Sequence, residues 1–288
     1  MNPLHPRLSP LHLRALAGVA ALGCLCHAPA VLAADDPPQD EAQAAPPVLN
    51  YALGAIISTS PDYAGGAGRK NSLRPAWAVE YGRFRLSTSR GSAFMGHGLR
   101  PRESGASATL AESDRFHVSA SLRIDKGRDG SDASILVGLP SVRSTLRARV
   151  SGGYALTDRL SVGVGVSQDL LGRDGGAQAS VSMGYAWPVT EQTRVTFGAG
   201  ASMGDKTYLR GHFGVPANSA TGLPAFSPGG GVYSVDAGVE VMSAINRHWV
   251  VYGAARVSRL QGDARRSPVV VDPTGYSVSV GLAYRCCR

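Results

Sequence analysis

The residue types that most often perform chemistry are present in this chain, but they are not arranged as catalytic groups. Seven histidines are dispersed along the 288 residues, and none has the spacing of an H-x-x-x-H zinc site. Ser92, Ser104 and Ser267 lack the G-x-S-x-G turn that exposes a nucleophilic serine. We therefore predict no catalytic residue, no metal ligand and no cofactor-binding residue, and we do not expect an enzyme.

The glycine-rich segment GGAGRK, residues 65–70, is superficially similar to a phosphate-binding loop. It departs from the spacing G-x-x-x-x-G-K-[ST], and it is not followed by a helical pattern. We interpret the segment as a flexible turn between two strands.

A second group of residues is charged and lies within segments of alternating polarity. It comprises Arg147, Arg149, Arg194, Asp236, Glu240, Arg256 and Arg285. In a barrel of about 12 strands these side chains would point into the lumen. They would either plug it as ion pairs or line a narrow, weakly charged pore. Because a buried charge without a partner costs several kcal/mol, a balanced set favours the plug.

The segments that position these charges alternate between apolar and polar residues. Leu160, Val162, Val164 and Val166 alternate with serine and glycine, and the same period of two recurs over 116–125, 177–187, 194–202, 233–241, 249–257 and 276–285. This period indicates strands with one apolar and one polar face. A soluble β-sandwich also alternates. However, these segments approach the roughly 9–11 residues that a tilted strand needs to cross a bilayer.

Aromatic residues and the joints between segments also favour a membrane barrel. Near segment ends, where an interfacial girdle is expected, lie Tyr154, Tyr185, Trp187, Trp249, Tyr276 and Tyr284. Residues 157–159 and 189–191 resemble tight turns, whereas 91–114, 125–133 and 204–230 resemble long loops. We therefore predict an all-β fold, an antiparallel transmembrane up-and-down β-barrel of about 12 strands, with 10 as the alternative. The short turns would face the periplasm.

Composition excludes several other classes of protein. Beyond the N-terminus no apolar run reaches the roughly 20 residues of a transmembrane helix. The net charge is +8, but the basic residues are scattered rather than clustered, so we expect no nucleic-acid partner. Cys24 and Cys26 lie near the start, and Cys286 and Cys287 near the end, which leaves no cysteine in the body for a disulfide framework.

The N-terminus reads as a secretory signal over residues 1–33. Arg7 and Arg14 precede an apolar stretch, and small residues at the −3 and −1 positions predict cleavage after Ala33. A membrane anchor and lipidation at Cys24 are the alternatives. Residues 34–47 are acidic and rich in proline and alanine, which predicts a solvated periplasmic arm. Residues 48–288 form the predicted barrel.

Four stretches of the body are typical of one family. The first contains Pro61, Tyr63 and Gly65 in the pattern Pro-x-Tyr-x-Gly, with Pro75, Tyr81 and Phe84 following. The second is the long loop DKTYLRGHFGVPANSATGLPAFSPGGG, the third is LQGDARRSPVV, and the fourth is the closing strand GYSVSVGLAYR. By these stretches the chain resembles the MipA/OmpV family of outer-membrane proteins, whose founding name means MltA-interacting protein. The resemblance covers residues 50–288, and it departs at Cys286, where the family's closing strand would have an aromatic residue.

The resemblance implies an outer-membrane protein of a Gram-negative bacterium. It also implies a scaffold for murein-remodelling enzymes, with a lytic transglycosylase (a murein hydrolase) and a penicillin-binding synthase as periplasmic partners. Two alternatives come from other classes of function: a channel permeable to small solutes or drugs, and a surface adhesin that acts through loops such as 204–230. Outer-membrane lipid is the expected surrounding in each case.

Overall fold

The computed structural model describes residues 48–88, 91–95 and 104–286. The predicted signal peptide (1–33), its cleavage site at Ala33, the acidic arm (34–47) and the last two residues lie outside the described residues.

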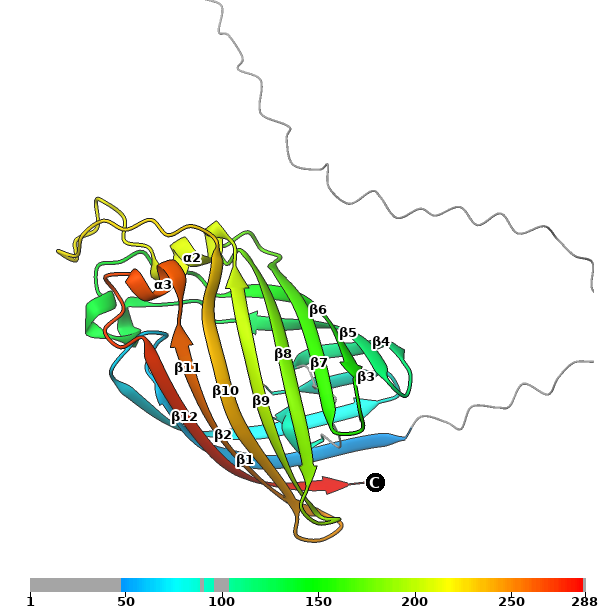
Figure 1. The fold of residues 1–288 in the computed structure, drawn as a ribbon. Coiled ribbons are helices and arrows are strands. Elements are labelled where there is room, and N and C mark those ends of the chain that lie inside the picture. Colours follow the sequence, from blue (N-terminus) through cyan, green and yellow to red (C-terminus); the bar gives the residue numbers. More distant parts are fainter. Residues whose placement is uncertain (1–47, 89–90, 96–103, 287–288) are drawn as a thin grey trace, which may run out of the picture. The chain divides into compact units, whose positions relative to one another are not determined.

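Twelve antiparallel strands form a closed barrel, in which every strand pairs with its neighbours in sequence and the last strand returns to the first (Figure 1). The predicted fold class and the preferred strand number are therefore confirmed. The strands are β1 (Leu49–Pro61), β2 (Arg69–Tyr81), β3 (Phe84–Ser87), β4 (Gly105–Glu112), β5 (Phe116–Asp125), β6 (Thr145–Ala155), β7 (Leu160–Asp169), β8 (Ala177–Pro188), β9 (Thr193–Gly204), β10 (Gly231–Ala244), β11 (Trp249–Leu260) and β12 (Thr274–Cys286).

The apolar residues of the alternating segments face outward. Val164 and Val166 of β7 are 62% and 61% exposed, whereas Ser167, which follows Val166 and points to the other face, is 2% exposed. Register places Val150 and Ala179 on either side of Val166, so the apolar face continues across neighbouring strands. A soluble sandwich would bury this face; lipid replaces that core here. Among the described residues, no helix is long and apolar enough to cross a membrane.

The two rims of the barrel differ in the length of their connections. Tight turns join β2 to β3, β4 to β5, β6 to β7, β8 to β9 and β10 to β11 at one rim, and the longer loops lie at the other. Figure 1 shows the helices α2 (Lys206–Phe213) and α3 (Gly262–Arg266) at the long-loop rim. The predicted turns at 157–159 and 189–191 are thus correct, and residues 65–68 lie in the connection between β1 and β2.

All three predicted long loops contain regular structure, which in 125–133 is a 3₁₀ helix at Gly130–Asp132. Residues 91–114 were expected to be a loop, but Gly105–Glu112 form β4, which pairs with β3 and β5. Its sequence GASATLAE has mostly small residues on both faces, so the apolar–polar alternation that indicated β5 and β7 to β12 is weak. Within 204–230, Asp205 caps α2 by accepting a hydrogen bond from the Tyr208 N–H at 2.7 Å.

A short helix fills part of the lumen. Strand β3 has only four residues, and after it the chain forms α1 (Gly91–Phe94) inside the barrel. Phe94 is fully buried against inward-facing residues of β1, β2, β11 and β12: Ala52, Ile56, Ala76, Ala78, Val250, Tyr252 and Ala283. The ring meets Tyr252 edge-on at 5.9 Å between centroids. We call this cluster the α1 plug.

Gly281 on β12 provides the space for the plug. A Cβ at this position would lie 2.9 Å from the Phe94 ring and 2.6 Å from Ile56. The glycine face of the closing strand therefore lets an aromatic side chain pack directly on the barrel backbone. At the end of the same strand, Cys286 pairs with Tyr51, so the residue that departs from the family pattern still closes the sheet.

Substitution of Phe94 tests whether the plug contributes to stability. Phe94→Ala should lower the free energy of unfolding by about 3–5 kcal/mol, because it leaves a cavity among fully buried side chains. Urea titration of the protein in lipid vesicles, read by the heat-dependent gel shift, measures this loss. Phe197→Ala is the matched control, since Phe197 faces lipid and is 45% exposed. Equal losses in both variants would contradict a packed plug.

Candidate functional site: the barrel lumen and its two rims

The lumen contains a polar cavity of about 770 Å³, lined by residues of β5, β6 and β8 to β12. Its wall includes serine, glycine and threonine residues of β8 and β9, such as Ser180, Ser182 and Thr196. Charged side chains from β5, β6, β10 and β11 project into this space. Volumes of roughly 300–1,000 Å³ are typical of sites for small molecules, so the cavity has the size of a binding site or a channel segment.

Four of the residues singled out in the sequence line this cavity: Arg149, Asp236, Glu240 and Arg256. Their interactions are local. Arg149 donates to the Ser180 hydroxyl at 2.9 Å, and Glu240 accepts from the Tyr252 hydroxyl at 3.2 Å. Arg256 and Asp236 approach within 3.7 Å, and the Arg256 side chain is 66% exposed. The charges therefore remain accessible to water in the lumen.

The other three charged residues lie elsewhere. Arg147 is fully buried at the long-loop end of the barrel and is held by loop atoms. Arg194, in register with Met242, lies at the short-turn end of β9. Arg285 lies at the end of β12, where its backbone N–H bonds the His248 carbonyl at 2.7 Å. The charged residues of the lumen-facing side of the strands thus lie at three different depths along the barrel axis.

Two lumen residues were missed by the sequence analysis. Arg123 of β5 and Tyr252 of β11 both line the cavity. Arg123 alternates with apolar Leu122 and Ile124, which is the same signal that identified Arg149. Tyr252 interrupts a polar face with an aromatic ring, and nothing in its local sequence shows that it reaches Glu240.

A smaller cavity of about 240 Å³ lies at the short-turn end of the lumen. It includes Asp114, Arg115 and His117, and it shares Ser182 and Glu240 with the wall of the larger cavity. The polar space therefore extends along the β7–β10 side of the barrel toward the short turns, on the side away from the α1 plug.

The loops at the opposite rim form a packed layer, which we call the loop cap. It consists of the connections 126–144, 205–230 and 261–273. Leu136, Leu139, Val215 and Val269 are buried together in one cluster, and Leu209, Phe213 and Leu260 contribute to a second. Phe213 accepts a hydrogen bond at its carbonyl from the Ser267 hydroxyl, which ties α2 to the connection before β12. The cap is thus built like a small protein core.

Arg147 fastens the loop cap to the barrel. Its Nε donates to Asp125 at 3.0 Å, and its terminal nitrogens donate to the carbonyls of Gly176 and Gly175 at 3.0 and 2.6 Å. The guanidinium also lies 5.8 Å from the centroid of the Tyr208 ring on α2. One buried cation therefore contacts two strands, the β7–β8 loop and α2.

His212 is the titratable group at the centre of the cap. Its ring stacks on Tyr208 at 4.2 Å between centroids, and its Nδ1 lies 3.0 Å from the Tyr208 carbonyl. Arg128 donates to the His212 carbonyl at 3.0 Å. Burial holds the pKa of His212 below its ordinary value of 6.5, and the nearby Arg128 and Arg147 act in the same direction. His212 is therefore neutral at neutral pH.

Three of the tight turns share one hydrogen-bonding pattern. Each begins with an exposed aliphatic residue, Leu156, Val189 or Ile245, whose N–H bonds a carbonyl four residues later at 2.9 Å. The next residue, Thr157, Thr190 or Asn246, accepts with its side-chain oxygen from two following backbone N–H groups. This local bonding fixes the turn and leaves the aliphatic side chain 47–60% exposed. The rim thus repeats one apolar contact point three times.

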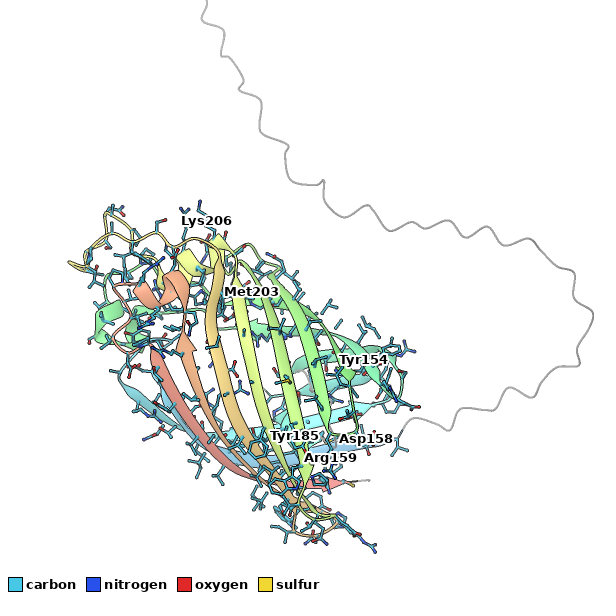
Figure 2. All side chains as sticks on the ribbon, in the orientation of Figure 1. Tyr154, Asp158, Arg159, Tyr185, Met203 and Lys206 are labelled. Carbon is cyan, nitrogen blue, oxygen red and sulfur yellow. The ribbon has the colours of Figure 1, made fainter. Side chains whose placement is uncertain are left out.

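Aromatic side chains gather on the outer surface beside these turns. Figure 2 shows Tyr154 and Tyr185 toward the same end of the barrel as Asp158 and Arg159, whereas Lys206 lies at the opposite end. Further outward-facing aromatics at this end are Tyr81, Phe84, Phe116, Trp187 and Trp249, all 40–62% exposed. Amphipathic rings prefer the membrane interface, so this girdle marks one edge of the lipid-facing belt. Among the described residues, no group of histidine, cysteine and acidic side chains could hold a metal ion.

The profile of the family described as MltA-interacting protein MipA matches residues 53–286, which is nearly all of the barrel. The chain belongs to the MipA family. Outer membrane protein OmpV of Vibrio cholerae serotype O1 is 25% identical to this family member over 156 residues, covering 54% of the chain and 60% of OmpV. The match thus spans less than two thirds of OmpV. The barrel topology and this relative place the MipA family member in the outer membrane of a Gram-negative bacterium.

Solved outer-membrane barrels resemble the MipA family member only distantly. OmpT of Vibrio cholerae is 10% identical with a TM-score of 0.37, covering 83% of this chain and 97% of OmpT. OprD of Pseudomonas aeruginosa is 10% identical with a TM-score of 0.31, covering 83% and 95%. Structural similarity this low does not indicate a shared function.

Removal of the Arg147 guanidinium should loosen the loop cap. Arg147→Met leaves Asp125 without its cation, and we expect a loss of about 3 kcal/mol, near the low end for a broken buried pair because Asp125 is 22% exposed. Urea titration with the gel-shift readout measures the change. Arg210→Met, on the exposed side of α2, is the control and should change stability little. Equal stability of the two variants would show that Arg147 does not fasten the cap.

Acidification should also loosen the cap through His212. Because its pKa is depressed in the folded state, neutral His212 contributes stability above pH about 6.5, and this contribution is lost as the pH falls through the lower folded value. Protection factors for hydrogen exchange across residues 205–230, corrected for the intrinsic rate of amide exchange at each pH, should therefore be lower at about pH 5 than at about pH 7. His212→Gln should remove most of that difference, whereas His248→Gln, on an exposed turn, should not. An unchanged pH dependence in His212→Gln would assign it to another group.

Proposed function

We propose that this MipA family member is a non-catalytic scaffold that holds murein-remodelling enzymes at the periplasmic face of the outer membrane. The observation that carries the proposal is the match of residues 53–286 to a family described as MltA-interacting protein. The partners would be a lytic transglycosylase and a penicillin-binding synthase.

The rim of tight turns supports a docking role. Leu156, Val189 and Ile245 project from three turns of the same construction, and charged residues such as Arg159, Glu191 and Arg247 follow them in the chain. Exposed aliphatic groups bordered by arginine and acidic side chains are a composition that suits protein interfaces. Because each turn is fixed by its own hydrogen bonds, little conformational entropy would be lost on binding.

A triple substitution tests the rim directly. Leu156→Gln, Val189→Gln and Ile245→Gln together should reduce the capture of both murein enzymes in a cross-linked pull-down by at least about tenfold, since each removes apolar area that a docked partner would cover. The turn bonds come from other atoms, so the barrel should remain heat-modifiable. Deletion of residues 34–47, the predicted arm, should abolish capture if the arm also docks.

The matched control places the same three changes on the opposite rim. Val137, Leu171 and Val271 are 63%, 50% and 58% exposed on the long-loop side. Glutamine at these positions should leave capture unchanged. Equal loss from both triple variants, or capture that survives the short-turn changes, would contradict docking at the rim.

A solute channel is the second candidate function, and the polar lumen cavity favours it. If the water-accessible space beside Arg149 conducts ions, the protein should give single-channel steps in planar bilayers, and Arg149→Gln should shift selectivity away from anions. Arg194→Gln should do the same if the path continues to the short-turn rim. Silent bilayers with correctly folded protein would exclude this function.

A further inference from the structure

The lumen cavity is charged unevenly around its wall. Arg123 on β5 and Arg149 on β6 lie on one side, and Asp236 and Glu240 lie on β10. Four strands separate β5 from β10 on one side of the closed ring and six on the other, so these strands face each other nearly across the barrel. The wall between them includes small residues such as Ser182 and Gly200, together with Gln178 and Met183. The cavity therefore has a basic side and an acidic side.

Arg149 is directed onto the basic side of the cavity by a glycine. To reach Ser180 on β8, its side chain crosses β7 at Gly165, where an added Cβ would collide with the guanidinium. The hydrogen bond of 2.9 Å to Ser180 then holds the group against the cavity wall. Gly165 thus sets the position of a charge that belongs to another strand.

Arg123 strengthens the basic side. Its side chain is exposed to the lumen, and no ion pair with it is found among the residues the structure describes. Serine occupies the next inward-facing position at Ser121. Two guanidinium groups on adjacent strands can bind a carboxylate through paired N–H donors.

The acidic side also has room for a ligand. Asp236 is held only loosely, 3.7 Å from an Arg256 group that is largely exposed. A Cβ at Gly200 would come within 3.4 Å of the Asp236 carboxylate, so the glycine keeps space beside it. Glu240 lies further along the same strand and is oriented by the Tyr252 hydroxyl. These carboxylates can accept hydrogen bonds from an ammonium group.

We propose that the lumen cavity binds small zwitterionic solutes, of the size of an amino acid or a dipeptide, with the carboxylate at Arg123 and Arg149 and the ammonium group at Asp236 and Glu240. The volume of about 770 Å³ accommodates such a solute together with water. The low-dielectric walls of the barrel strengthen the attraction at both ends relative to bulk water. The site lies inside the barrel, away from the rim, so it is independent of the scaffold role.

Three related peptides test the requirement for both charges. The full chain, purified and heat-modifiable in detergent, is titrated with alanyl-alanine, N-acetyl-alanyl-alanine and alanyl-alanine amide at neutral pH, and binding is read by saturation-transfer NMR. The zwitterion should bind at least about tenfold more tightly than either capped peptide, because each cap removes one of the two charge contacts. Equal affinities, or no binding of alanyl-alanine up to about 50 mM, would overturn the proposal.

Substitutions then assign the two ends. Arg123→Gln should weaken alanyl-alanine at least about fivefold and leave the amide peptide unaffected, whereas Asp236→Asn should weaken alanyl-alanine and leave the acetyl peptide unaffected. Gly165→Ala should act like the loss of Arg149, since only the end of a flexible side chain must move to admit the methyl group. Arg159→Gln, on an exposed turn, is the control for net charge. Unchanged affinity in both Arg123→Gln and Asp236→Asn would place the peptide elsewhere and refute the site.

Discussion

The structure depends on pairing every backbone N–H and C=O group within the hydrocarbon layer, where water cannot serve as a partner. The pairing of β1 with β12, from Tyr51–Cys286 to Thr59–Val278, meets this requirement by closing the sheet. Among the strands that the structure describes, β3 is the shortest, with four residues. There the Thr88 N–H and hydroxyl bond the carbonyl and N–H of Trp77 at 3.0 and 3.1 Å, taking over from the missing strand residues.

Closure also determines the chemistry of the interior. Once lipid takes the apolar face of each strand, the polar face has no solvent except what the lumen holds. The inward-facing polar side chains are accommodated in three ways at different depths of the barrel. The α1 plug fills one side of the lumen. Loop carbonyls at the loop cap accept hydrogen bonds from the buried Arg147, and Arg149, Asp236 and Arg256 lie beside the cavity. The same residue types are therefore structural at one depth and accessible at another.

The sequence was sufficient for the barrel and insufficient for its contents. Alternation identified strands such as β7 and β12 because each strand that crosses the bilayer places every second side chain against lipid. It missed β4, where Leu110 is the one large apolar residue of GASATLAE, and it gave no sign that Phe94 packs inside. Phe94 and its partners lie far apart in the chain, so no local pattern records their contact.

For the candidate site, local periodicity predicted that Arg147 and Arg149 share a face, but it could not separate their surroundings. The two residues differ because loop carbonyls at Gly175 and Gly176 reach Arg147, whereas Arg149 lies over Gly165. Both circumstances arise from residues about 16 to 29 positions away in sequence. Depth along the barrel axis, which decides between a buried ion pair and an accessible charge, is a property of the assembled strands.

The aromatic girdle beside the tight turns has a consequence for where the protein sits. Rings such as Trp187, Trp249 and Tyr154 favour the headgroup level and resist movement in either direction. Since they gather at the short-turn end, the membrane interface at that end fixes the depth of insertion. The tips of the turns are thereby held at a constant height above that surface of the membrane. A partner seated on them would be kept at one fixed elevation and would retain freedom only to rotate and slide in the plane of the bilayer.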